Sequence, residues 1–354
     1  MKSASIIVQH PRQLTVAWAQ QILNQHQANI QVASVSINSV DVGTTTRVRL
    51  KVQHNAAQLP QHWFVKLPSL AWRARVITAL PHLLPNEIRF YQELAKLTPV
   101  QLPRCLAAHK QQGRGSTLVL ADITEDNALA GKADDVLSFN QAIDVIEQLA
   151  KLHAHFWQRA QQYRWLAGSI RQLEDALGTA LAVPLMRRGL HLAGEHVPAS
   201  LHVSALRYAK NRRQVMRFLH NAPQTLVHHD SHAGNLFWDS YKTRVGFLDW
   251  QLLRLGEGIG DVAYFLATAL EPPLRRQHEI ALITRYAQTL TTYGINADTT
   301  QLLPRYRAHL SYALEAMLVT LAVGGMMNQH SNLELIRRTA SAVHELDSYD
   351  VLPL

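Results

Sequence analysis

Hydrophobic and polar positions follow two different rhythms along this chain, and the rhythm changes near residue 125. Before that point, apolar residues tend to alternate with polar ones, as expected of strands that bury one face. The segments of this kind are Ile30–Val42, Arg47–Val52, His62–Leu67 and Ser116–Leu120. Two segments with apolar residues three and four positions apart, Pro11–Gln25 and Asn86–Leu97, predict helices.

After residue 125 the helical rhythm dominates. Phe139–Trp157 shows it most plainly, because Ile143, Ile146 and Leu149 share one face behind Ser138, a residue suited to cap a helix. Further helices are expected over Ala199–His220, Gly258–Leu270, Pro273–Tyr293, Thr300–Val323 and Asn332–Leu346, with short strands around Leu226 and Phe247 among them.

The pattern therefore predicts an α+β fold with two lobes and a cleft between them. We expect a small strand-rich lobe over residues 1–123 and a larger, mainly helical lobe over residues 124–354. A length of 354 residues is enough for two such lobes. Apolar residues make up 47% of the chain and charged residues 17%, so each lobe can bury a core.

Charge and hydropathy narrow the possible partners. The net charge of +9 suits anionic ligands such as nucleotides, but the basic residues are dispersed and predict no nucleic-acid partner. The longest apolar run, Ala316–Met327, is too short to span a bilayer. With one cysteine, Cys105, and no apolar leader at the N-terminus, we expect a cytoplasmic protein that has no disulfide and needs no membrane.

The most specific chemistry lies in the stretch from His228 to Asn235. An apolar run leads into it, and a second apolar run leads into Asp249, fourteen residues after Asn235. The five-residue gap between Asp230 and Asn235 places a carboxylate and an amide on one tight loop. A carboxylate base, an amide ligand and a separate carboxylate ligand form the minimum set for moving a phosphoryl group from a Mg-nucleotide to a hydroxyl. Asp230 is the expected base, and Asn235 and Asp249 are the expected Mg²⁺ ligands.

The two histidines that flank Asp230 allow a rival interpretation. On an extended strand, His228, Asp230 and His232 would point to one face, as a Zn²⁺ or Mn²⁺ site of a metal-dependent hydrolase requires. The residues Ala233, Gly234 and Asn235 favour a turn instead. If the segment is a turn, we expect His228 to hold the loop backbone, and His232 to support the loop or to lie near the substrate.

Three further features of the sequence suit a nucleotide site. Lys66 ends an apolar strand and is a candidate for binding phosphate, and Glu87, at the start of the next helix, is a candidate to hold it extended. Gly43, Thr44 and Thr45 lie between two strands, where a hairpin would set small residues and backbone N–H groups over phosphates. A plain turn is equally compatible with that segment.

Asp261 opens a predicted helix in the segment Gly256–Tyr264. We expect its carboxylate to hydrogen-bond to the backbone of the catalytic loop, which is a structural role rather than a chemical one.

These motifs resemble the aminoglycoside phosphotransferase and choline kinase-like family of the protein-kinase-like fold, with its ecdysteroid kinase-like branch also similar. The resemblance rests on His228-x-Asp230-x-His232-x-Gly234-Asn235 followed by Asp249-Trp250-Gln251. The segment Leu149–Trp157 is similar to the family's helix before the substrate region, and Leu118–Ile123 to its hinge, where backbone groups meet the adenine.

The resemblance implies a bilobal kinase fold, with ATP and Mg²⁺ as cofactors. It makes Asp230 the catalytic base, Asn235 and Asp249 the metal ligands, Lys66 and Glu87 the phosphate-lysine pair, and Gly43, Thr44, Thr45 and Asp122 nucleotide-binding residues. The chain departs from the family at His229, where glycine is usual, and at Ala121, where an acidic residue is common, and its phosphate loop is poor in glycine.

The expected activity is an ATP- and Mg²⁺-dependent transfer of the γ-phosphoryl group to a hydroxyl of a small alcohol, sugar or antibiotic-like molecule. The acceptor would be held by residues from about 160–220 and 270–340, among them Tyr163, Trp165, Arg187 and Arg188. The alternatives are the metal-dependent hydrolase and a catalytically quiet, kinase-like binding protein. The sequence does not specify the acceptor or the oligomeric state.

Overall fold

The structure is a computed structural model that describes residues 6–71, 83–159, 162–167, 169–239 and 244–354. The chain divides into two compact units. Unit 1 comprises residues 1–130 and 237–251, and unit 2 comprises residues 131–236 and 252–354. The segment 237–251 therefore belongs to the same unit as the N-terminal part of the chain. The expected division into residues 1–123 and 124–354 does not include this return of the chain to unit 1.

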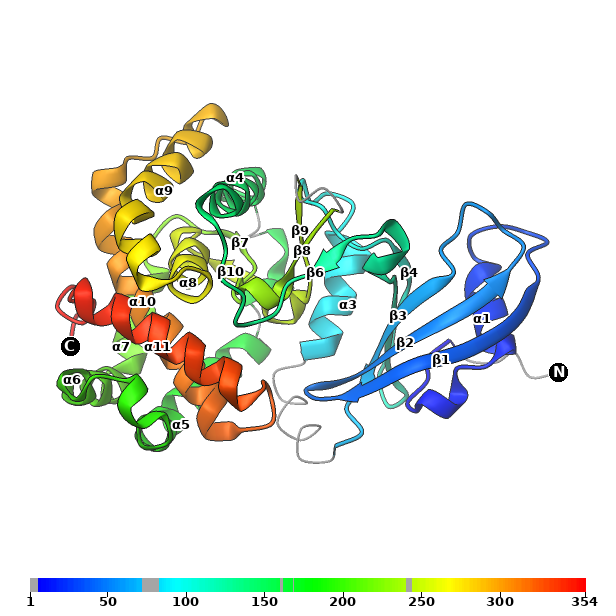
Figure 1. The fold of residues 1–354 in the computed structure, drawn as a ribbon, viewed down its shortest axis with the longest axis horizontal. Helices are drawn as coiled ribbons and strands as arrows, with labels where there is room; N and C mark the ends of the chain where they lie inside the picture. The colour runs from blue at the N-terminus through cyan, green and yellow to red at the C-terminus, as the bar shows by residue number, and fades with distance from the viewer. Residues whose placement is uncertain (1–5, 72–82, 160–161, 168, 240–243) are drawn as a thin grey trace. The chain divides into compact units, whose positions relative to one another are not determined.

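Unit 1 is built on an antiparallel sheet with the strand order β1-β2-β3-β5-β4 (Figure 1). The strands are β1 (Val32–Val42), β2 (Thr45–His54), β3 (His62–Pro68), β4 (Cys105–Gln111) and β5 (Gly115–Ala121). Four of them lie within a few residues of the expected segments. β4 was missed, because its apolar part is only the four residues from Cys105 to Ala108 before it turns polar.

The alternation along β3 sets the direction of Lys66. Trp63, Val65 and Leu67 are fully buried and join a core that includes Trp18 of helix α1 (Val16–Leu23). The rings of Trp18 and Trp63 meet edge to face, with centroids 5.9 Å apart. Because successive side chains on a strand point to opposite faces, Lys66 leaves the sheet on the other side, where α3 packs.

Two expected helices of unit 1 have different bounds in the structure. The segment Pro11–Gln25 is a 3₁₀ turn (Pro11–Gln13) followed by α1, and the hydroxyl of Thr15 accepts a hydrogen bond from the amide of Trp18 at the start of α1. α3 (Leu83–Glu93) extends further toward the N-terminus than Asn86, and Glu87 lies inside it rather than in its first turn.

The segment 237–251 adds a second, small sheet to unit 1. β6 (Leu129–Ala130), β8 (Leu236–Trp238) and β9 (Val245–Phe247) lie in the order β6-β8-β9. The amide of Phe247 donates to the carbonyl of Gln101 at 3.0 Å, which ties β9 to the loop before β4. This connection carries the residues that follow β9, including Asp249, to α3.

Unit 2 is mainly helical, as the sequence predicted. Its helices are α4 (Phe139–His155), α5 (Ser169–Ala193), α6 (Ala199–Lys210), α7 (Arg212–His220), α8 (Ile259–Ala269), α9 (Pro272–Thr292), α10 (Thr299–Val323) and α11 (Gln329–Glu345), and its short strands β7 (Thr225–Val227) and β10 (Arg254–Gly256) pair antiparallel. All residues of α8 except Gly260 are buried, and α8 packs against α10 and α11 (Figure 1). α8 is therefore the central helix around which unit 2 is built.

One helix expectation for unit 2 was wrong, and one helix was missed. The expected helix over 199–220 is two helices, because Asn211 has a backbone conformation that ends α6 and precedes α7. Helix α5 was not expected, since Pro184 interrupts its pattern and its apolar residues do not keep to one face.

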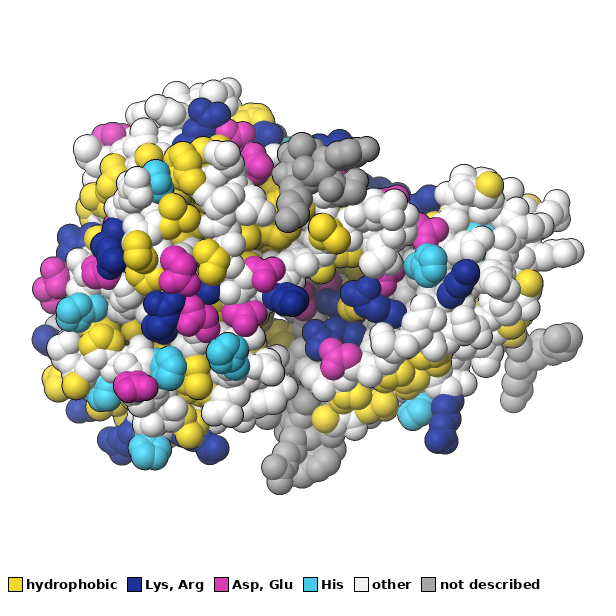
Figure 2. All heavy atoms as spheres, in the orientation of Figure 1, with side chains coloured by type: hydrophobic (Ala, Val, Ile, Leu, Met, Phe, Trp, Pro, Cys, Tyr) yellow, Lys and Arg dark blue, Asp and Glu magenta, His cyan; other side chains and the backbone are white. Residues whose placement is uncertain are grey.

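Charged side chains are dispersed over the surface of unit 2. On the face shown in Figure 2, acidic and basic side chains of this unit alternate and do not gather into one basic patch. In the described part of the chain, no helix is both long enough and apolar enough to cross a membrane.

Gly189 makes the packing of α5 against α10 possible. A Cβ at this position would lie 2.5 Å from the carbonyl oxygen of Leu318, so the helix backbones approach more closely there than any side chain allows. Gly178, about three turns earlier on α5, faces only the guanidinium of Arg212, and a Cβ there would have its nearest neighbour at 3.3 Å.

We predict that Gly189→Ala destabilises the protein by about 1–3 kcal/mol, because α5 must move away from a backbone carbonyl. Gly178→Ala is the matched control on the same helix and should stay within about 1 kcal/mol of the wild type, since alanine favours the helix and the neighbouring side chain can shift. Chemical denaturation of the two variants measures the difference. Equal stability would contradict the close approach at Gly189.

Candidate active site

In unit 1, one buried lysine lies between two carboxylates. Lys66 Nζ is 2.9 and 2.8 Å from the two carboxylate oxygens of Glu87 and 3.1 Å from Asp249 Oδ1. The side chains of Lys66 and Glu87 are 4% and 0% exposed, whereas that of Asp249 is 30% exposed. The pairing of Lys66 with Glu87 that the sequence suggested is present, and Asp249 joins it.

The cluster sets one basic group against two acidic groups. Burial would lower the pKa of Lys66, but Asp249 and Glu87 outweigh burial and raise it, so the lysine is a cation. Burial raises the pKa of Glu87, and Asp249 raises it further against the lowering effect of Lys66. Lys66 thus lies between two acidic side chains. Asp249 is the partly exposed one of the two, so a further cation would be stabilised beside Asp249.

Helix α3 holds Trp250, the residue that follows Asp249. Asp249 adopts a left-handed conformation with φ 57°, which aspartate tolerates better than most residues. The next residue, Trp250, donates its amide to Glu87 Oε1 at 3.3 Å and stacks on Phe90 of α3, with ring centroids 4.2 Å apart. Glu87 thus binds Lys66 with its carboxylate and also fixes the turn that presents Asp249.

The other nucleotide-binding candidates of unit 1 have internal partners. Gly43 and Thr44 form the turn between β1 and β2, and Gly43 accepts a hydrogen bond from Ser69 Oγ at 2.7 Å. Thr45 is buried at the start of β2. Asp122 is also buried and uses its carboxylate to bind Arg49 and to cap the turn at Thr124. A role for these residues in binding nucleotide stays a prediction.

In unit 2, the carboxylate of Asp230 is held by two donors. Tyr264 Oη donates to Asp230 Oδ1 at 2.7 Å, and Asn235 Nδ2 donates to Asp230 Oδ2 at 2.9 Å and to the Asp230 carbonyl at 2.8 Å. Burial, and then the Asp230 carboxylate, raise the pKa of Tyr264 well above its ordinary value, so the phenol keeps its proton. Each carboxylate oxygen retains a further lone pair with which to accept a proton.

The flanking histidines support the loop rather than forming a metal site with Asp230. His228 is fully buried and its Nδ1 accepts from the amide of Asp230 at 3.3 Å, while His232 Nδ1 accepts from the amide of Gly234 at 3.0 Å. The contact of His228 is the bond to the loop backbone that was expected of it, and the contact of His232 fits support of the loop, one of the two roles expected for that residue. Within the described ranges, no group of three His, Cys, Asp or Glu side chains is arranged to hold a metal ion.

Asp261 anchors the start of the loop that carries Asp230. Its carboxylate is 2% exposed and accepts the amides of His228 at 2.7 Å and His229 at 2.8 Å, as well as a hydrogen bond from His153 Nε2 at 3.2 Å. Burial alone would raise the pKa of Asp261, but these donors lower it below its ordinary value of 3.8. The expected bond between Asp261 and the loop backbone is present.

Asp261 also helps to hold His229, the residue before Asp230, in an unusual backbone conformation. His229 has φ 69°, a left-handed conformation in which glycine is favoured. Its amide is fixed by Asp261, and its ring packs edge to face on Tyr312 with centroids 4.5 Å apart. These contacts compensate for the backbone strain of a histidine at this position.

Sequence reasoning missed the roles of Tyr264, Tyr312 and His153 at this site. A signal for Tyr264 was present, because it lies three residues after Asp261 and therefore on the same face of α8. No comparable signal marks Tyr312, which is distant in the sequence.

The chain has the protein-kinase-like fold. The structure is similar to a wild-type aminoglycoside 2'-phosphotransferase-IIIa in its GDP complex, at 12% identity and a TM-score of 0.52 over 94% of this chain and 98% of that chain. A putative aminoglycoside phosphotransferase from Ralstonia eutropha JMP134 is similar at 16% identity and a TM-score of 0.52, over 96% of this chain and 100% of that one. An ethanolamine kinase from Plasmodium vivax is similar at 12% identity and a TM-score of 0.52, over 98% and 93%.

The sequence assigns the family. Residues 41–296 match the Phosphotransferase enzyme family, and the chain belongs to it. No curated protein matches the chain by sequence. The solved structures are so distant in sequence that they establish the fold and not the substrate.

We predict that Asp261→Asn destabilises unit 2 by about 1–3 kcal/mol, because an amide cannot accept both loop amides and leaves one buried donor unpaired. The lowered pKa of Asp261 means that its contribution to stability is complete above pH 3.8 and is lost as the pH falls through the lowered value. Denaturation at neutral pH measures the loss. Asp298→Asn, at an exposed helix cap, is the control and should unfold like the wild type; a variant at Asp261 that does the same would refute its anchoring role.

Proposed function

We propose that this protein is a Mg²⁺-dependent phosphotransferase that moves the γ-phosphoryl group of a nucleoside triphosphate to a hydroxyl of a small molecule. The observation that carries the proposal is the buried cluster of Lys66, Glu87 and Asp249, in which one ammonium faces two carboxylates. Such a cluster suits a lysine that binds phosphate beside a carboxylate that binds a metal ion. Membership of the Phosphotransferase enzyme family supports the same reaction class.

Asp230 is the proposed base. Its carboxylate orients the acceptor hydroxyl and takes its proton as the oxygen–phosphorus bond forms. The hydrogen bonds from Tyr264 and Asn235 keep the carboxylate from rotating, so that one lone pair stays directed at the acceptor. Tyr264 is a positioning residue in this scheme.

Asn235 and Asp249 are the proposed Mg²⁺ ligands. The amide nitrogen of Asn235 is committed to Asp230, which leaves its Oδ1 for a cation, and Asp249 offers a partly exposed carboxylate. An amide oxygen, one carboxylate and phosphate oxygens suit this hard ion. Bound Mg²⁺ would neutralise charge on the phosphates during transfer.

The nucleotide is proposed to be ATP. One structural relative was solved as a GDP complex, so guanine nucleotides are the competing choice. Comparing ATP and GTP as phosphate donors decides between them.

The acceptor is proposed to be a neutral or anionic alcohol, sugar or antibiotic-like molecule. Structural relatives include an aminoglycoside phosphotransferase and an ethanolamine kinase, but a net charge of +9 gives no particular support for a polycationic acceptor here. Of the candidate acceptor segments, residues 160–161 and 168 lie outside the described residues. Arg187 and Arg188 are exposed on α5, and Tyr163 and Trp165 are half-buried before it.

The intact cluster also argues against a quiet binding protein. A protein that only binds a ligand has no need of a buried lysine with two carboxylates together with a braced base. A screen of ATP consumption over alcohols, sugars, aminoglycosides and macrolides, with the phosphorylated product identified by its mass, tests the proposed activity. Absence of any phosphorylated product across these classes would contradict it.

We predict that Asp230→Asn lowers the rate of phosphoryl transfer by about 10²–10⁴-fold, the usual scale of general-base catalysis. Binding of ATP should remain nearly unchanged, because Asp230 is not among the proposed phosphate or metal ligands. Steady-state turnover and nucleotide titration of the same preparation measure the two quantities. Turnover equal to that of the wild type would exclude Asp230 as the base.

We predict that Asp249→Ala abolishes the thermal stabilisation that Mg·ATP confers on the protein, because the carboxylate ligand is lost. Glu93→Gln is the control in unit 1, since Glu93 is an exposed carboxylate paired with Arg89 on α3 and should leave the shift intact. Thermal denaturation with and without Mg·ATP measures both. A full shift in Asp249→Ala would rule out its proposed metal role.

A further inference from the structure

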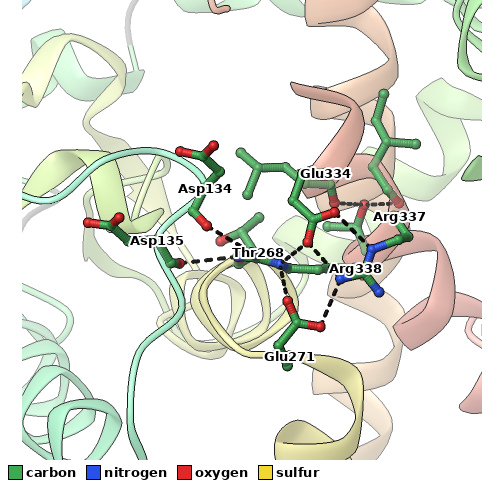
Figure 3. Close-up of polar contacts among 10 residues, drawn as sticks. Asp134, Asp135, Thr268, Glu271, Glu334, Arg337 and Arg338 are labelled. Atoms are coloured by element: carbon green, nitrogen blue, oxygen red, sulfur yellow. Dashed lines mark hydrogen bonds and ion pairs between the residues drawn. The ribbon is translucent and has the colours of Figure 1, made fainter. Parts of the chain in front are cut away.

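Arg338 of α11 is a buried cation that binds three backbone carbonyls as well as two carboxylates. It is 2% exposed, and its guanidinium donates to the carbonyls of Asp134 at 2.8 Å, Asp135 at 3.1 Å and Thr268 at 2.9 Å (Figure 3). Its Nε donates to Glu334 at 2.9 Å and lies 3.3 Å from Glu271. The rigid fork of an arginine suits this set of acceptors, which a lysine ammonium cannot span.

The two backbone segments that Arg338 joins both border the catalytic loop. Thr268 lies near the end of α8, the helix that carries the loop anchor Asp261 and the base-orienting Tyr264. Asp134 and Asp135 belong to the segment before α4, which touches the loop at a second point.

That second point is a close backbone contact. A Cβ on Gly234 would lie 2.9 Å from the amide nitrogen of Ala133, so the segment packs directly on the residue before Asn235. The amide of Gly131 also donates to the carbonyl of Leu236 at 2.9 Å, just after Asn235. The segment 131–135 therefore contacts the residues immediately before and after Asn235, the proposed metal ligand.

We propose that Arg338 is a positioning residue for the catalytic loop. By fixing the segment 131–135 and the end of α8 in one place, it holds Asn235 and Asp230 in the orientation that phosphoryl transfer requires. The part of this inference that concerns turnover rests on the proposed function, and the part that concerns loop order does not.

Arg337 offers a matched control next in the chain. It binds the same two carboxylates, Glu334 at 2.6 and 2.8 Å and Glu271 at 2.8 Å, but no hydrogen bond between it and the segment 131–135 is found among the described residues (Figure 3). Its side chain is 40% exposed. Removing Arg337 therefore disturbs the ion pairs without releasing the backbone that Arg338 holds.

Hydrogen exchange tests the effect on the loop without reference to activity. In Arg338→Ala, the amides of residues 228–236 should exchange at least about tenfold faster than in Arg337→Ala, because the segment that covers them is released. Gly189→Ala, on α5, controls for general destabilisation. Equal exchange over residues 228–236 in Arg338→Ala and Gly189→Ala, compared at equal margins below their melting temperatures, would overturn the proposal.

Turnover supplies the readout that separates positioning from stability. Arg338→Ala should lower kcat by about 10–100-fold and raise the Mg²⁺ concentration for half-maximal rate, with KM for the acceptor little changed. Arg338→Lys should recover only part of the rate, and Arg337→Ala should resemble the wild type. An unchanged kcat and an unchanged Mg²⁺ requirement in folded Arg338→Ala would also overturn the proposal.

A wild-type protein without transferase activity would refute the proposed function, while the exchange result would still decide the role of Arg338 in ordering the loop.

Discussion

The loop that carries Asp230, the proposed base, depends on the hydrogen bonds that its amides donate to the carboxylate of Asp261. That carboxylate is buried in the central helix of unit 2 and accepts the amides of His228 and His229, which directs the chain into the turn that leads to Asp230. Because the same carboxylate also binds His153 of α4, the loop is tied to two helices at once. The strained backbone of the loop is acceptable only because these partners are fixed before any ligand binds.

A comparable constraint organises unit 1. Glu87 pairs with Lys66 and also accepts the amide of Trp250, so one buried side chain holds both the lysine proposed to bind phosphate and the turn that presents Asp249. Each unit thus relies on one buried acid that does not itself take part in the proposed chemistry. The proposed base, Asp230, and the exposed proposed ligand, Asp249, are positioned by these acids and stay accessible to substrate.

Local patterns in the sequence predicted many of the elements and candidate site residues. The contacts that the sequence did not predict join residues that are distant in the chain. Alternation along β3 indicated that Lys66 leaves the sheet opposite its apolar neighbours, and the spacing of Asp230 and Asn235 indicated a shared loop. The ion pair between Lys66 and Asp249 joins residues that no local rule connects, and the interleaving of residues 237–251 into unit 1 follows from tertiary pairing alone. α5 was missed because Pro184 interrupts its pattern and its apolar residues do not keep to one face.

The central proposal is that Asn235 and Asp249 are Mg²⁺ ligands when a nucleotide is bound. Electron paramagnetic resonance of Mn²⁺, used in place of Mg²⁺, measures it most directly. The account predicts one bound Mn²⁺ per chain only when ATP is present, with the affinity lowered at least about tenfold by Asn235→Ala and by Asp249→Ala alike. Stoichiometric Mn²⁺ binding without nucleotide, or an affinity that neither substitution changes, would contradict it.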